Sequence, residues 1–141
     1  QHIVAERNVP LTDSEIKKYQ KRRDAFNHVT VMYKRDMVLK AGNYQSCLLM
    51  EDTLLWVHMI LSGAKCMNIN KPLVFVRIGK DMFKRRGGWS YYQKYKNGRK
   101  QVYETGYISK CDYYYTLLVQ LLVALMPQHM RGFVFKKILH R

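Results

Sequence analysis

The chain has 141 residues, 48 % of them hydrophobic, so it can bury a core and a wholly disordered protein is excluded. Lys and Arg number 25 against 10 Asp and Glu, which gives a formal net charge of +15. This imbalance predicts an anionic partner or surface, such as nucleic acid, acidic lipid headgroups or a nucleotide diphosphate. Between Arg77 and Lys110 the only acids are Asp81 and Glu104. Because the excess of basic residues is concentrated in one segment, it indicates a binding site for an anion more than a general aid to solubility.

The start of the chain and its cysteines bear on its compartment. The first residue is Gln1, and no basic stretch followed by an apolar run opens the chain, so we expect no signal peptide. The sequence fits a piece of a longer protein. Cys47, Cys66 and Cys111 show no C-x-x-C spacing, which predicts reduced thiols in a cytosolic protein and no metal site.

The first third of the chain predicts a helix, a strand and a short helix. Thr12 is the expected N-cap and Glu15 follows three residues later, a capping box that begins a helix over 12–23. β-branched and aromatic residues over 27–33 predict a strand. Asp36 then begins a short helix, which Gly42 ends.

The middle third contains a strongly apolar segment. Residues 53–63 are mostly apolar and predict a largely buried helix that Gly63 ends. Segments 66–69 and 73–78 are expected as short strands. The stretch 79–88 is rich in basic and turn residues and predicts a loop.

Helices are predicted for the rest of the chain, over 89–104, 112–126 and 128–140, with Pro127 as the break. The apolar run 113–126 is shorter than the roughly 20 residues that cross a bilayer. It also contains Gln120, so a core helix or a helix lying on a surface is favoured over a membrane span.

Glu51 and Asp52 are adjacent acids directly before the apolar helix. One interpretation is structural, because an Asp at a helix start accepts hydrogen bonds from free N–H groups and meets the positive end of the helix dipole. The other is a general base held beside a cleft. The residues alone leave both open.

Short motifs follow one another in order along most of the chain. They are His28-x-Thr30-Val31-Met32-Tyr33-Lys34, Val38-x-x-Ala41-Gly42-x-Tyr44, Glu51-Asp52-x-x-Leu55-Trp56, Asn68-Ile69-x-x-Pro72-Leu73-Val74-x-x-Arg77, Met82-x-x-Arg85-Arg86-Gly87-Gly88, Met126-Pro127 and Lys136-Lys137-x-Leu139. This series resembles the second, acceptor-side half of bacterial family 2 glycosyltransferases, closest to those that build capsular and exopolysaccharides.

The resemblance implies an α+β fragment of a GT-A fold, with the acceptor-side part in 1–88 and a helical region in 89–141. In that family a first half carries an Asp-x-Asp motif, which holds a divalent metal, Mg or Mn, against the donor diphosphate. This sequence has no Asp-x-Asp, so the donor and metal half, with the metal ligands, is expected outside it. We therefore expect no metal bound here and no transferase activity from this chain alone.

The resemblance also assigns roles to residues at the acceptor side. Asp52 corresponds to the general base of an inverting transfer, and Glu51 is expected to orient the loop or bind an acceptor hydroxyl. His28 and Trp89 are candidates for sugar contacts. For His28 a hydrogen-bonded core position is the alternative, and for Trp89 it is packing beneath the loop. Trp56 is expected in the core.

Basic residues are candidates for the donor phosphates. Arg85 and Arg86, beside two glycines, suit bidentate phosphate contacts on a mobile loop, and Arg77 is expected to face the same cleft. The alternatives are a solvated loop, a loop facing acidic lipid, or a structural ion pair between Arg77 and the acidic pair.

The expected partners are a nucleotide-sugar donor and a glycan or lipid-linked acceptor, in the cytoplasm or at the inner face of the plasma membrane. Lys136, Lys137 and Arg141 could add about 1 kcal/mol each against an anionic leaflet. Exposed strand edges would favour homo-oligomers. The competing interpretations are a basic nucleic-acid-binding module, although no nucleic-acid motif is present, and a membrane-surface adaptor without catalytic activity.

Overall fold

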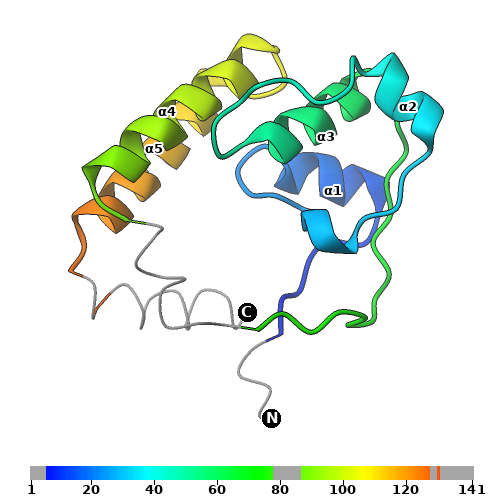
Figure 1. Ribbon diagram of the computed structural model, residues 1–141, viewed down its shortest axis with the longest axis horizontal. Helices are drawn as coiled ribbons and strands as arrows, with labels where there is room; N and C mark the ends of the chain where they lie inside the picture. The colour runs from blue at the N-terminus through cyan, green and yellow to red at the C-terminus, as the bar shows by residue number, and fades with distance from the viewer. Residues whose placement is uncertain (1–5, 78–86, 128–129, 131–141) are drawn as a thin grey trace.

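A computed structural model describes residues 6–77, 87–127 and 130 of the chain. Within them the regular elements are helices: α1 (Asp13–Tyr19), the single 3-10 turn η1 (His28–Thr30), α2 (Arg35–Lys40), α3 (Glu51–Leu61), α4 (Trp89–Glu104) and α5 (Lys110–Leu125). In Figure 1, α4 and α5 lie side by side at one side of the molecule, and α3 lies between this pair and α2.

The helices begin and end largely where their sequence signals predict. Thr12 and Glu15 form the predicted capping box of α1, although the helix ends at Tyr19 and only turns follow it. Gly42 and Gly63 follow α2 and α3 with φ of +86° and +92°, a conformation that glycine adopts without strain. α5 begins two residues before its predicted start, because Ser109 caps it in a capping box with Asp112.

α3 is the central helix and is apolar on two sides. One side packs Leu55 and Trp56 against α2 in a cluster completed by Val38, Ala41, Met59 and Ala64. The other side packs Leu54 and Val57 against the α4–α5 region in a cluster completed by Cys47, Met50, Val102 and Ile108. The predictions of a buried helix and a core Trp56 are therefore confirmed.

The predicted α+β class is wrong for the part of the chain that the structure describes. Segment 27–33 forms η1 between extended residues, and segments 66–69 and 73–77 form no strand. A strand needs a neighbouring strand to accept its backbone hydrogen bonds. The 66–69 segment bonds to α1 and its approach instead: Cys66 N donates to Asp13 Oδ1 at 2.8 Å and Asn68 N to Leu11 O at 3.2 Å.

The described residues offer no strand edge for pairing, and the predicted self-association stays a prediction. The three thiols are free, with Cys47 buried, Cys66 partly buried and Cys111 exposed. Apart from residue 130, the helix predicted over 128–140 lies outside the described residues, as does most of the loop over 79–88. The boundary predicted between 88 and 89 stays a prediction.

Candidate active site

The acidic pair forms the first turn of α3. Met50, not an acid, is the N-cap residue, and it makes no side-chain cap hydrogen bond. Glu51 is exposed and Asp52 is partly buried, so neither carboxylate is sealed inside the packing. Asp52 Oδ1 accepts a hydrogen bond from Thr53 N at 3.1 Å. Part of the predicted structural role is thus present, while the carboxylate still reaches the surface.

Aromatic rings gather around Trp56, in the second turn of this helix. The ring of His28 lies 6.0 Å from that of Tyr44 and 6.4 Å from that of Trp56, and Tyr33 lies 5.8 Å from Trp56. Tyr44 Oη and His28 Nδ1 are 3.4 Å apart. His28, Tyr33 and Tyr44 are all exposed, whereas Trp56 beneath them is buried. The predicted core position of His28 is therefore not observed.

The pKa of Tyr44 is raised to about 12. Desolvation is the largest cause, a hydrogen bond with Tyr33 is the next, and the negative charge of Asp52 acts in the same direction. A phenol with this pKa is neutral at physiological pH. Tyr44 therefore offers a neutral hydroxyl, which can both donate and accept a hydrogen bond, within the electrostatic reach of Asp52.

Asp24 forms hydrogen bonds with the first turn of α3 and with the residue that follows α1. Its Oδ1 accepts hydrogen bonds from Thr53 Oγ1 at 2.8 Å and from Gln20 Nε2 at 2.9 Å. Desolvation raises the pKa of Asp24 although both bonds lower it, and the charge of Asp52 raises it further. The first turn of α3 is thus joined to the end of α1 through a carboxyl that lies close enough to Asp52 to interact with its charge.

The backbone that enters α3 is strained at Leu49, whose φ is +68°. A bulky residue in this left-handed conformation costs about 1–3 kcal/mol, and such residues cluster at functional sites. Leu49 lies two residues before Glu51, so the strain falls directly beside the acidic pair.

Of the predicted phosphate and sugar contacts in the described part of the chain, Arg77 and Trp89 show no contact with the acidic pair. Arg77 is exposed, and none of the ion pairs among the described residues joins it to Glu51 or Asp52. Trp89 is exposed at the first residue of α4, and its ring contact is with Tyr92 at 5.3 Å. Arg85 and Arg86, like Lys136, Lys137 and Arg141, lie outside the described residues.

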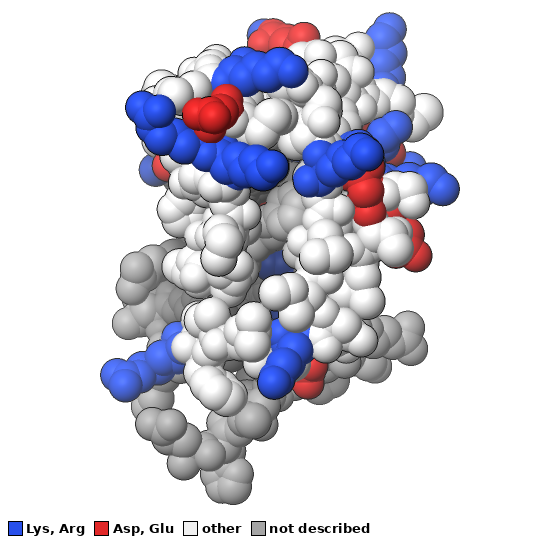
Figure 2. Space-filling model, turned by 90° about the vertical axis from the view of Figure 1, so that its right-hand side faces the viewer, with Lys and Arg blue, Asp and Glu red and all other residues white. Residues whose placement is uncertain are grey.

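Basic side chains gather on one part of the face drawn in Figure 2. They lie mainly toward the upper end, where Figure 1 places α2, with a few acidic side chains among them. Uncharged atoms cover much of the middle of this face. The apolar residues Leu73 to Val76, which lie in a segment predicted as a short strand, are exposed.

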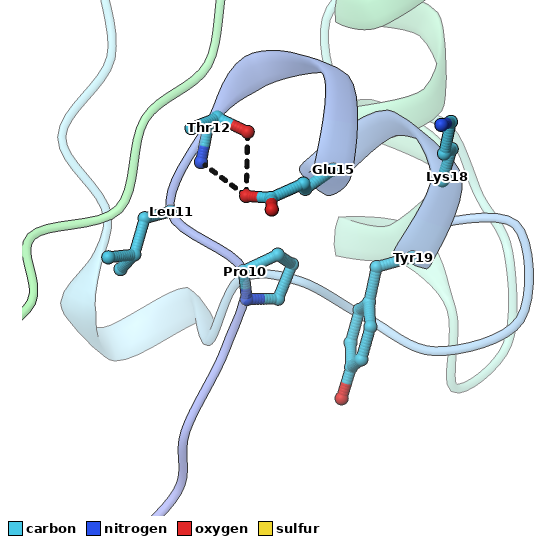
Figure 3. Close-up of a pocket in the computed structure, with 6 residues that line it drawn as sticks. All are labelled: Pro10, Leu11, Thr12, Glu15, Lys18 and Tyr19. Carbon is cyan, nitrogen blue, oxygen red and sulfur yellow. Dashed lines mark hydrogen bonds between the residues drawn. The ribbon is translucent and has the colours of Figure 1, made fainter.

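A shallow hollow of about 790 Å³ lies beside α1, lined by Pro10, Leu11, Thr12, Glu15, Lys18 and Tyr19 (Figure 3). Its carboxylate is already engaged, because Glu15 Oε2 accepts hydrogen bonds from Thr12 Oγ1 at 2.6 Å and Thr12 N at 3.3 Å. Neither Glu51 nor Asp52 lines it. This hollow is therefore a feature of the capped helix end and not of the acidic pair.

Among the described residues, no three His, Cys, Asp or Glu side chains lie together as a metal would require. In the same part of the chain, no helix combines the length and the apolar character needed to cross a bilayer. The divalent metal stays a prediction for residues outside this chain.

Sequence reasoning missed Asp24 and gave Tyr44 no role at the site. Asp24 ends the basic run Lys21-Arg22-Arg23 and has no periodic apolar neighbours that would mark it as partly buried. Tyr44 stood in one of the motifs, but its position beside His28 depends on the turn after α2, which no local pattern fixes.

Comparison with known proteins shows that the chain belongs with the bacterial glycosyltransferases of polysaccharide biosynthesis. It is 34 % identical over 135 residues to the UDP-Gal:alpha-D-GlcNAc-diphosphoundecaprenol beta-1,3-galactosyltransferase of Escherichia coli. The aligned region covers 96 % of this chain and 49 % of that protein. It is 32 % identical over 137 residues to the amylovoran biosynthesis glycosyltransferase AmsE of Erwinia amylovora, with 93 % and 49 % covered.

A third relative is an uncharacterized glycosyltransferase of Haemophilus influenzae, 41 % identical over 86 residues that cover 61 % of this chain and 32 % of that protein. The chain thus spans about half the length of the first two relatives, as expected for the C-terminal part of such an enzyme. No protein-family profile matches the chain, and neither does any solved structure.

Proposed function

We propose that the chain is the acceptor-side part of a family 2 glycosyltransferase that transfers a sugar with inversion, with Asp52 as the general base. The main support for this proposal is the position of Asp52 in this chain, which is homologous to glycosyltransferases. Its partly exposed carboxylate lies at the first turn of a buried helix, beside the exposed rings of His28 and Tyr44. Exposed aromatic rings and a neutral phenol suit a sugar, whose ring has apolar faces and hydroxyl edges.

In this mechanism the acceptor hydroxyl oxygen bonds to the anomeric carbon of the donor sugar while the bond from that carbon to the leaving phosphate oxygen breaks. The hydroxyl proton passes to Asp52, and the departing nucleoside diphosphate takes the electron pair of the broken bond. General-base help of this kind contributes about 10²–10⁴ in rate. Glu51 and His28 would bind acceptor hydroxyls, and Tyr44 is a further candidate for that contact.

The donor in this proposal is a nucleotide sugar, and the acceptor is a glycan or a lipid-linked sugar. The printed name of the E. coli relative, with a UDP-sugar donor and a diphosphoundecaprenol-linked acceptor, supports these classes. Arg77, Arg85 and Arg86 remain candidates for the donor phosphates, and a divalent metal would assist the same leaving group from outside this chain. No observation on the described residues favours the nucleic-acid-binding alternative.

The test of the base is Asp52→Asn in an enzyme that spans the full length of the relatives. The carboxamide keeps the shape but cannot accept the proton, so transfer should fall by about 10²–10⁴ while donor binding stays unchanged. Product formation and donor affinity are measured separately. Asp36→Asn, at an exposed acid in the first turn of α2, is the matched control and should keep full activity.

Transfer by the Asp52→Asn enzyme at the rate of the control would reject the role of this residue. A second measurement uses the present chain alone, which should form no glycoside from a nucleotide sugar. Turnover by the chain alone would contradict the assignment of the donor site to residues outside it.

A further inference from the structure

The outer face of α5 is apolar along its length. Between Tyr113 and Leu125 the helix carries no charged residue. Its inner side buries Leu117 and Ala124. Its opposite side leaves large apolar side chains exposed, and we call them the α5 outer face: Tyr114, Tyr115, Leu118, Val119, Leu122 and Leu125. A helix that is apolar all round is normally covered all round, and an exposed apolar patch of this kind marks an interaction site.

A groove of about 530 Å³ continues this face toward α4. It is lined by Tyr92, Lys96, Tyr113, Tyr114, Leu117, Leu118 and Leu121. Its walls are thus tyrosine and leucine, with a single cationic side chain. Tyrosine has an apolar ring and a polar hydroxyl, and this combination favours the boundary between water and hydrocarbon.

The charges around this face are mostly positive. Lys96 and Lys100 are exposed and lie four residues apart on α4, hence on the same side of that helix, and Lys110 is exposed at the start of α5. The nearby acids are engaged: Glu104 lies 3.6 Å from Lys100, and Asp112 is buried and pairs with Arg22 at 2.6 Å.

We propose that the α5 outer face docks on an anionic lipid surface, with Lys96 and Lys110 at the level of the headgroups. An apolar face with a cationic rim complements a bilayer of anionic lipids, because leucines enter the acyl boundary while lysine stems extend to the phosphates. The inference uses a surface other than the acidic pair and does not depend on the transferase proposal.

The test is co-sedimentation of the chain with vesicles of equal parts phosphatidylglycerol and phosphatidylcholine, and with vesicles of phosphatidylcholine alone. We expect binding to the anionic vesicles and at least tenfold weaker binding to the neutral ones. The double change Leu118→Glu and Leu122→Glu should weaken binding to the anionic vesicles at least tenfold. Leu39→Glu with Leu61→Glu, at exposed leucines of α2 and α3, is the matched control and should bind like the unchanged chain.

The lysines are tested separately. Replacing Lys96 and Lys110 by Gln should weaken binding about fivefold for each lysine, as expected for a cation near an anionic membrane surface. Lys21→Gln with Lys71→Gln removes the same charge from exposed positions on other segments and should have a much smaller effect. Far-UV circular dichroism checks that every variant keeps its helix content.

Three results would overturn the proposal. The first is equal binding to anionic and neutral vesicles. The second is binding that survives the α5 and lysine changes but is lost when Lys136 and Lys137 become Gln. The third is a dimer in light scattering that Leu118→Glu converts to monomers, with no vesicle binding by either form.

Discussion

At the scale of single residues, Asp24 is the group whose protonation the fold controls most clearly. Its carboxyl is largely shielded from water and receives side-chain hydrogen bonds from the neutral donors of Thr53 and Gln20. Desolvation therefore raises its pKa in the folded state above the unfolded value of about 3.9. Between these two pKa values the folded chain binds more protons than the unfolded chain. The free energy of unfolding therefore falls as the pH rises from the lower pKa to the higher one.

Asp24→Asn keeps the oxygen that accepts both hydrogen bonds and removes the charge. We expect this variant to be at least as stable as the unchanged chain at neutral pH, and its stability to vary less as pH rises from about 4. Asp24→Ala should lose about 1–3 kcal/mol, because the Thr53 hydroxyl and the Gln20 amide lose their acceptor. Urea unfolding of all three proteins at several pH values checks this, and equal losses for Asn and Ala at neutral pH would contradict it.

At the scale of elements, α4 depends on a glycine for its close approach to the segment before α3. A Cβ at Gly98 would lie 3.1 Å from Leu48 O and 3.1 Å from Met50 Cγ. Gly98 is buried and has ordinary helical backbone, so an added methyl group would have to push the Leu48 carbonyl or the Met50 side chain aside by a few tenths of an ångström.

Gly98→Ala should therefore destabilise the chain by about 1–3 kcal/mol through overpacking, although alanine is the better helix former. Asn97→Ala is the matched control, because Asn97 is exposed on the same helix and only helix propensity changes there. The control should be neutral or slightly stabilising. Thermal unfolding of both variants decides the matter, and a Gly98→Ala protein as stable as the control would refute the packing role.

The elements that the sequence predicts well are those whose signals are local. α3 follows from its apolar content and from Gly63 at its end, and α1 from its capping box. The strand predictions failed because a strand depends on a distant partner, and the backbone of the 66–69 segment bonds to Leu11 and Asp13 instead. Asp52 was predicted from a motif, whereas the contribution of Asp24 depends on a contact with Thr53, 29 residues away, that no pattern records.

At the scale of the whole molecule, residues far apart in sequence join the first part of the chain to α5. Arg22 Nε donates to Asp112 Oδ1 at 2.6 Å, and Tyr107 Oη donates to Lys17 O at 2.6 Å. The buried Arg99 on α4 donates to Thr116 Oγ1 at 3.0 Å and to the backbone oxygen of Lys21. These contacts, with the two clusters that share α3, predict that the described part unfolds as one unit.

In a Trp89→Phe variant, fluorescence reports the core around Trp56, while far-UV circular dichroism reports mainly the long helices α4 and α5. We expect the two signals to give the same urea midpoint, as in a two-state transition. Separate midpoints would show that α4 and α5 can come apart from α3 before the rest unfolds.

The position of Cys111 gives this chain a natural attachment point for a reporter. Cys111 is exposed, while burial raises the pKa of the Cys47 and Cys66 thiols and makes them less reactive. It precedes Tyr115, Leu118 and Leu122 by four, seven and eleven residues, a spacing that places all four on one side of α5. An environment-sensitive dye on this thiol would shift its emission when that side leaves water, without any engineered cysteine.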